Sequence, residues 1–444
     1  MPHTVNWKSF LDYAEVTDVG MRRSNNQDSK AVMLAPDPDL WRKRGHVFLV
    51  ADGMGAHAAG ELASKIAADT IPHTYHKLTL PPPNAIRKSI REVNATIHRR
   101  GQSNLDFQGM GTTASTLVLL PQGALVGHVG DSRVYRLRGR QFEQLTFDHS
   151  LVWEMSAAGH IPKDAVPSIV PKNVITRSLG PHPDVQVDLE GPFPIEVGDI
   201  FLLCSDGLMA GKLSDREIGA ILQALPPAES ARVLVDLANL RGGPDNITVI
   251  VVRITHPALA TLPENQPGLL PIGEDLQEKK AKKMMSIVMW AAAVCFLILG
   301  LVLTTTSLPW YIPTIAFVAA AMFLGFGFLQ LSTVPEPEYS YLPAGRMLGK
   351  GPHTRCECQP DGALSDDLAR LAHELRDAAT KGSWAIDWAK FNGYVKAGVE
   401  AADQDDFTTA VREYGRALRT MMAELRNQRQ RAKPDDSEVD LLGK

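Results

Sequence analysis

The sequence HVFLVADGMGAH, residues 46–57, places Asp52 directly after an apolar, β-branched run. Three further aspartate-centred segments follow or precede similar runs: RSNNQD (23–28), SDG (205–207) and GPDNIT (243–248). The pattern predicts that each carboxylate lies where a strand begins or ends, at the mouth of a β-sheet. Carboxylates gathered there, with no histidine or cysteine cluster among them, are typical ligands of hard divalent cations.

In this order, with GDSR (130–133) between the second and third, the segments resemble the signature of metal-dependent protein phosphatases of the PPM type, also called type 2C. The runs LTFDHS (145–150) and ITRSLG (175–180) also match that family. The resemblance covers about residues 10–255. One Asp-Gly pair alone is only a turn signal, but four segments in sequence with matching flanks indicate the family.

The resemblance implies an α+β fold, a four-layer αββα sandwich in which two antiparallel β-sheets are flanked by helices and the metals lie at one end. Alternating strand and helix patterns agree with this fold, with strands at 46–51, 115–120, 200–204 and 247–254 and amphipathic stretches at 60–73, 85–100, 215–225 and 228–240. Residues 135–146 are typical of a hairpin. The irregular stretch between 150 and 179 resembles the family's flap, a place for substrate selection.

The resemblance also assigns metal ligands. Asp52 bridges two Mn²⁺ or Mg²⁺ ions, Asp206 and Asp245 complete one site, and the Gly53 carbonyl serves the other, an approach that glycine permits. Asp28 acts from behind these ligands or through a metal-bound water.

Two further residues have a function implied by the resemblance and also an ordinary structural interpretation. Arg23 is the expected phosphate clamp, because its planar fork holds two phosphoryl oxygens at once; the alternative is an exposed arginine before a strand. Asp131 contributes with Asp206 to a third, weaker ion, and the alternative is a turn aspartate before Arg133. Both alternatives stay open at the level of sequence.

Two positions depart from many eukaryotic members of the family. Gln27 stands where those members have a glutamate, so one contact is neutral and that ion binds less tightly. Met54 replaces the histidine proposed as general acid, and a thioether cannot donate that proton. Either metal-bound water protonates the leaving alkoxide or His57 substitutes. Bacterial members commonly carry methionine here.

The implied function is hydrolysis of phosphoserine and phosphothreonine by attack of a metal-bridging water. The expected substrates are cytoplasmic or membrane-associated phosphoproteins, and the expected opponent is a eukaryotic-like serine/threonine kinase. The alternative is a membrane scaffold whose inactive phosphatase-like fold binds phosphoproteins. The net charge of −4 gives no general attraction to nucleic acid. The four cysteines suggest no disulfide framework, and one Cys-x-Cys pair has too few ligands for a metal site.

Residues 284–334 contain no charged residue and no histidine. One helix over that run would be roughly 75 Å long, far more than the ~30 Å of a bilayer core. Pro309 and Pro313 interrupt the run, which predicts a two-helix transmembrane hairpin with spans at about 285–307 and 310–331. A pair of buried helices in a soluble domain is the alternative.

Positive charge flanks both predicted spans, at Lys279–Lys283 before the first and at Arg346, Lys350 and Arg355 after the second. The connecting turn has none. This asymmetry predicts a multi-pass protein of the inner cell membrane, with two helices and both soluble parts in the cytoplasm. The N-terminus shows no apolar secretory segment.

At 444 residues the chain exceeds one ordinary domain. The predicted division is a phosphatase domain (1–255), a linker with a basic juxtamembrane segment (256–283), the hairpin (284–334), a linker (335–364), a helical domain (365–432) and a disordered tail (433–444). Within the helical domain, Tyr394–Leu418 resembles one tetratricopeptide helix pair, and a plain helical hairpin is the alternative. Either would offer a surface for a protein partner.

Overall fold

The structure is a computed structural model of the chain. It describes residues 9–55, 58–159, 174–262, 271–272, 276–306, 309, 311–332, 340–341 and 348–432. The chain forms two compact units, one comprising residues 1–77, 86–267 and 347–444, the other residues 78–85 and 268–346. The predicted tail 433–444 and His57 lie outside the described residues.

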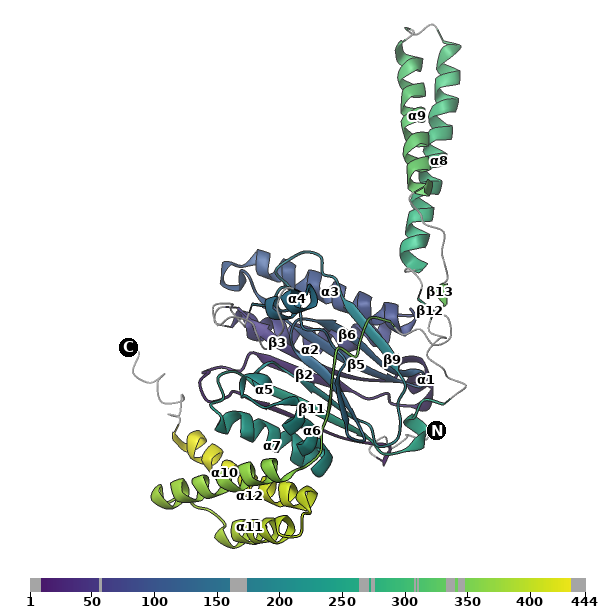
Figure 1. The fold of residues 1–444 in the computed structure, drawn as a ribbon. Helices are drawn as coiled ribbons and strands as arrows, with labels where there is room; N and C mark the ends of the chain where they lie inside the picture. The colour runs from purple at the N-terminus through teal and green to yellow at the C-terminus, as the bar shows by residue number, and fades with distance from the viewer. Residues whose placement is uncertain are drawn as a thin grey trace, which may run out of the picture. The chain divides into compact units, whose positions relative to one another are not determined.

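Two antiparallel β-sheets form the centre of the larger unit (Figure 1). The first has the order β1 (Leu11–Asp18), β11 (Ile247–Ile254), β10 (Ile200–Cys204), β7 (Arg133–Arg138), β8 (Gln141–Gln144) and β14 (Thr354–Glu357). The second has the order β2 (Asp28–Met33), β3 (His46–Met54), β5 (Ala114–Leu120), β6 (Gly123–Val129) and β9 (Asp188–Phe193), and β4 (Gly111–Thr112) pairs with β3.

The alternation of side chains along each strand builds two apolar layers. Phe201 and Leu203 of β10 pack with Phe48 of β3 between the two sheets. Leu202 and Cys204, one residue out of phase, lie on the opposite face with the covering helices. Because side chains alternate with a period of two, β10 is apolar throughout and buried on both faces.

Helices cover the outer face of each sheet. The second sheet is covered by α2 (Ala59–Lys77) and α3 (Pro82–Ser103), and the first by α6 (Asp215–Ala224) and α7 (Pro227–Leu240). The short helices are α1 (Pro38–Arg44), α4 (Leu151–Ala157), α5 (Gly207–Ala210), η2 (Leu105–Phe107) and η4 (Pro257–Leu259). A capping box between Ser214 and Glu217 fixes the start of α6. The predicted α+β fold with two sheets is therefore confirmed.

The C-terminal helices α10 (Gly362–Lys381), α11 (Trp388–Ala402) and α12 (Phe407–Ala432) belong to the same unit as the two sheets. Their apolar side chains join the layer that covers the first sheet. Gly415 of α12 lies against Leu225 and Val233, and the Arg412 Nε donates to the Ala224 carbonyl at 2.9 Å. Strand β14, from the predicted linker, extends the first sheet beside β8.

The smaller unit contains α8 (Leu276–Thr304), α9 (Tyr311–Ser332) and the short pair β12 (Pro271–Ile272) and β13 (Ser340–Tyr341). The two helices pack along each other. Gly300 lies against the Phe317 ring, and the rings of Phe296 and Phe323 stack with centroids 5.6 Å apart.

The predicted transmembrane hairpin is wrong. Among the described residues, no helix combines the length and the apolarity that crossing a membrane requires. The first turns of α8 carry charged residues. The transmembrane part of the predicted fold class and the two-pass inner-membrane localisation, with its orientation, are corrected accordingly.

Candidate functional site

The aspartates of the sequence motifs lie at strand ends of the two sheets. In the second sheet, Asp28 begins β2 and is the cross-strand partner of Asp52 in β3. In the first sheet, Asp206 stands two residues after β10, and Asp245 stands two residues before β11, which pairs with β10. Asp131 lies in the turn between β6 and β7. The fold thus brings the five carboxylates together from both sheets.

Burial and mutual repulsion raise the pKa values of this carboxylate cluster. Desolvation is the largest cause at each group. The pKa of Asp28 rises to about 7 and that of Asp131 to about 8, with Asp206 adding repulsion to both. The pKa of Asp52 rises well above its ordinary value, because Asp28, Asp206, Asp131 and Asp245 all repel its negative charge. That of Asp206 also rises, from burial and from repulsion by Asp245.

Three oxygens of the cluster are buried without a hydrogen-bond partner in the described part of the chain: the Oδ1 atoms of Asp28, Asp131 and Asp206. Such oxygens are costly unless a proton or a cation compensates them. The donor set consists only of oxygen, which hard divalent ions prefer. The residues therefore fit Mn²⁺ or Mg²⁺ chemically, although no three acidic, histidine or cysteine side chains among the described residues are spaced as a formed metal site.

Hydrogen bonds fix the backbone around Asp52. Its N–H donates to the Thr113 Oγ1 at 2.8 Å, and its carbonyl accepts from the Thr113 N–H at 2.9 Å. The Thr113 Oγ1 also contacts the Ser132 Oγ at 2.7 Å, which links Asp52 to the turn that carries Asp131. On the other side, the Ser205 Oγ donates to Asp28 at 2.7 Å and accepts from the Thr248 N–H at 2.9 Å.

Two glycines allow the motif segments to approach one another. A Cβ at Gly53 would lie 2.2 Å from the Gly60 carbonyl oxygen and 2.4 Å from that of Gln27. A Cβ at Gly207 would lie 1.9 Å from the Asn246 carbonyl oxygen. Only glycine fits at either position without moving a backbone segment.

Arg23 lies at the edge of the cluster. Its Nη2 forms an ion pair of 2.8 Å with Asp245, and about half of its side chain is exposed. The guanidinium therefore faces both a carboxylate of the cluster and solvent. Met54 is half-buried next to Gly111.

Sequence reasoning did not single out Asn246, which joins two of the motif segments. Its Oδ1 accepts from the Gln27 N–H at 2.8 Å, and its Nδ2 donates to the carbonyls of Val19 and Asn25, each at 2.9 Å. The loop with Arg23 is thereby tied to the segment with Asp245. The signal was present, because this asparagine belongs to the quoted GPDNIT motif.

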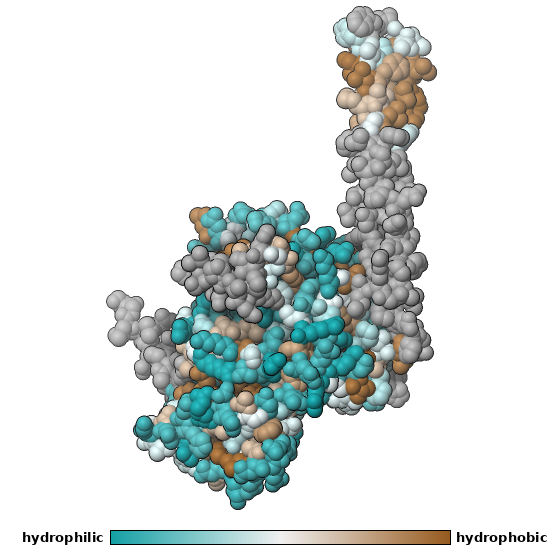
Figure 2. Space-filling view, in the orientation of Figure 1, coloured by the Kyte–Doolittle hydropathy of each residue, from teal (hydrophilic) through white to brown (hydrophobic). Residues whose placement is uncertain are grey.

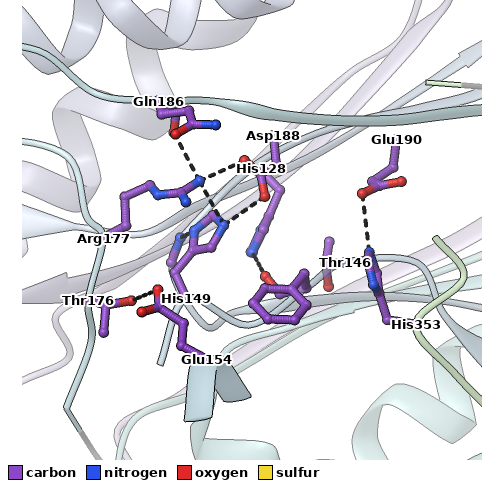
Figure 3. A network of polar contacts seen from close by, with 12 residues as sticks. His128, Thr146, His149, Glu154, Thr176, Arg177, Gln186, Asp188, Glu190 and His353 are labelled. Atoms are coloured by element: carbon purple, nitrogen blue, oxygen red, sulfur yellow. Dashed lines mark hydrogen bonds and ion pairs between the residues drawn. The ribbon is translucent and has the colours of Figure 1, made fainter. Parts of the chain in front are cut away.

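A polar network braces the turn that carries Asp131 (Figure 3). The His149 Nδ1 accepts from the Gly130 N–H at 2.9 Å, which assigns its proton to Nε2, and Nε2 donates to Asp188 at 2.9 Å. Arg177 donates to the other oxygen of Asp188 at 2.6 Å. Burial alone would raise the pKa of Asp188, but these two partners lower it to about 2.

The network explains the two smaller motif runs. His149 belongs to LTFDHS and Arg177 to ITRSLG, and together they fix the Gly130 turn to β9. Further along β9, Glu190 accepts from the Gly351 N–H at 2.7 Å and pairs with His353 at 3.1 Å (Figure 3). The segment before β14 is thereby attached to the same strand.

Comparison with known proteins identifies similar chains. The sequence model of a family described as protein phosphatase 2C matches residues 22–227. The protein phosphatase PhpP of Streptococcus pneumoniae is 36% identical over 251 residues, which cover 55% of this chain and 98% of the relative. The serine/threonine phosphatase stp of Listeria monocytogenes is 37% identical over 243 residues, 53% of this chain and 93% of the relative.

A solved structure shows the same likeness. The serine/threonine phosphatase of S. agalactiae is 35% identical, with a TM-score of 0.50, and the match covers 55% of this chain and 100% of that one. About half of the present chain therefore corresponds to the whole length of such relatives.

Proposed function

Since the chain belongs to the protein phosphatase 2C family of serine/threonine protein phosphatases, whose members depend on metal ions, we propose that it hydrolyses phosphoserine and phosphothreonine in proteins at the carboxylate cluster. The observation that carries this proposal is the meeting of five aspartates from two sheets, three of them with a buried, unpartnered oxygen. A serine/threonine kinase, which makes the phosphoester that this reaction consumes, is its proposed opponent.

The cluster would hold two Mn²⁺ or Mg²⁺ ions. Asp52 would serve both, Asp206 and Asp245 one, and the Gly53 carbonyl the other, with a third, weaker ion at Asp131. Bound there, the ions would supply Lewis-acid activation of water and neutralisation of phosphoryl charge. Asp28 would orient the metal-ligating carboxylates without being a main ligand itself, because a hydrogen bond of 2.7 Å from Ser205 holds it in place.

Arg23 would bind the phosphoryl group. Its half-exposed guanidinium is held at the cluster by one Nη–carboxylate contact, which leaves its other N–H groups for phosphoryl oxygens. Asn246 would position it, because that side chain anchors the Arg23 loop at Val19, Asn25 and Gln27. Met54 has no proton to give, so a water at the metal site or His57 would protonate the leaving oxygen.

The test uses the full chain with p-nitrophenyl phosphate and with a phosphothreonine peptide. We expect Mn²⁺-dependent turnover that EDTA abolishes and that Asp52→Asn lowers by about three orders of magnitude or more, since the shared ligand of both ions is lost. Turnover that survives both EDTA and Asp52→Asn would rule out this assignment.

A further inference from the structure

A second group of charged residues surrounds a pocket between the catalytic domain and the C-terminal helices. The cavity has a volume of about 400 Å³ and lies among α7, α11 and α12. It shares no residue with the carboxylate cluster. Its charged lining comprises Arg232, Lys390, Arg416, Arg419 and Arg426 against Glu229, Asp387 and Glu424.

Some of these charges are neutralised within the protein. Arg416 binds Glu229 through its Nε and Glu413 through its Nη1, each at 2.8 Å, and Arg426 pairs with the buried Asp236. Arg419 has only a distant contact with Glu229, at 3.9 Å. The lining holds five cations and three carboxylates, and two further carboxylates just outside it, Glu413 and Asp236, pair with Arg416 and Arg426. The cations without a close carboxylate partner in the described part of the chain are therefore Arg232, Arg419 and Lys390.

Arg232 is one of the cations that lack a close partner. It is half-buried on α7 and has no side-chain hydrogen bond or ion pair within the described residues. Burial lowers its pKa, and repulsion from Arg426 and Arg419 lowers it further, although Asp236 and Asp18 oppose this. A half-buried guanidinium that has two arginines near it and no ion pair of its own gains from an additional anion.

The remaining lining suits an anion with several oxygens. Lys390 is exposed at the pocket, and Tyr394 lies one turn further along α11. Asn427 of α12 adds an amide donor. The visible surface over the C-terminal helices is largely hydrophilic, with a smaller hydrophobic patch (Figure 2).

We propose that the pocket between α7, α11 and α12 binds a phosphoryl dianion, as a phosphate site additional to the catalytic one. The forked guanidinium groups of Arg232 and Arg419 match phosphoryl oxygens in geometry, and Lys390 contributes a point charge. The volume is within the range of ordinary ligand sites, roughly 300–1,000 Å³, so a phosphorylated side chain fits as well as free phosphate. An anion there bridges the catalytic domain and the C-terminal helices.

Calorimetric titration of the full chain in EDTA tests the proposal with three probes: inorganic phosphate, a phosphothreonine peptide and the same peptide with threonine. We expect Arg232→Gln and Lys390→Gln each to weaken phosphate binding at this site by about tenfold or more. The matched control is Arg370→Gln, an exposed arginine of α10 that is already paired with Asp367 and should change nothing. Arg23→Gln should leave this site intact.

The outcomes separate the two sources of the phosphoryl group. Binding of the phosphopeptide, but not of the threonine peptide, would identify a protein ligand, and binding of inorganic phosphate alone would identify the free anion. Unchanged phosphate binding in both Arg232→Gln and Lys390→Gln would overturn the proposal. Turnover of p-nitrophenyl phosphate should stay within about twofold of wild type in both variants, because neither residue belongs to the catalytic cluster.

Discussion

Replacing Asn246 by alanine should cost both stability and catalysis. The side chain is buried, with 5% of its surface exposed, and makes three hydrogen bonds. The carbonyl of Asn25 lies on an exposed residue and can bind water instead. The hydrogen bonds to the Gln27 N–H and the Val19 carbonyl each contribute ~1 kcal/mol, and their loss leaves both backbone groups unpaired at an added cost. The free energy of unfolding should therefore fall by about 2–4 kcal/mol.

The assay is urea unfolding of the full chain in EDTA, so that metal binding does not contribute to the free energy of unfolding. Asn104→Ala is the matched control, since this exposed asparagine caps η2 with one hydrogen bond of 3.0 Å and should cost about 1 kcal/mol or less. For Asn246→Ala, kcat/KM should also fall about a hundredfold, because the loop with Arg23 loses its anchor. A stability change equal to that of the control, with unchanged kcat/KM, would refute this reasoning.

Three further predictions concern other parts of the larger unit. Burial, with repulsion from His76, lowers the pKa of His46 to about 3, while an unfolded histidine titrates near 6.5. Between these two values the unfolded state binds more protons than the folded state, so the free energy of unfolding falls as the pH drops. From pH 7 to 5, urea titrations should show the free energy of unfolding of wild type falling by about 2 kcal/mol more than that of His46→Gln. Equal decreases in the two proteins would contradict this. Gly53→Ala should lower p-nitrophenyl phosphate turnover about a hundredfold through displaced backbone, and near-normal turnover would show that the segment adapts. A Cβ at Gly398 would lie 2.9 Å from the Tyr414 ring, whereas a Cβ at Gly393 on the same helix would meet nothing within 4 Å. Gly398→Val should therefore destabilise the chain by about 1–3 kcal/mol more than Gly393→Val. Equal unfolding midpoints of the two variants would refute the close approach of α11 and α12.

Strong periodic patterns in the sequence were sufficient to predict the central strands. The expected strands at 200–204 and 247–254 coincide with β10 and β11, because both are rich in apolar and β-branched residues. Strand β14 was not predicted. Its four residues alternate between partial and full exposure at the edge of the sheet, and only the ladder with β8 defines it.

The prediction of a membrane hairpin was wrong because it depends only on the absence of charge in residues 284–334. The same residues in α8 and α9 pack their aromatic and small side chains against each other, as Gly300 does with Phe317. Composition alone does not separate a membrane span from two helices that pack together.

The aspartates of the site could be identified from their motifs, but the residues that hold them in place could not. Thr113, Ser132 and Ser205 are ordinary polar residues in the sequence, and their roles depend on contacts between segments far apart in the chain. His149 belongs to a motif that was quoted, yet its contacts with Gly130 and Asp188 require the two neighbouring strands to be in place. The metal-binding aspartates could therefore be predicted from the sequence, but the hydrogen bonds that hold them in place could not.

Titration of the metal-free full chain with Mn²⁺, followed by calorimetry, tests the carboxylate cluster most directly. Wild type should bind at least about two ions per chain, and Asp52→Asn should lose tight binding of both, because Asp52 is the carboxylate that every other member of the cluster faces. Equal Mn²⁺ stoichiometry and affinity in wild type and Asp52→Asn would contradict the account.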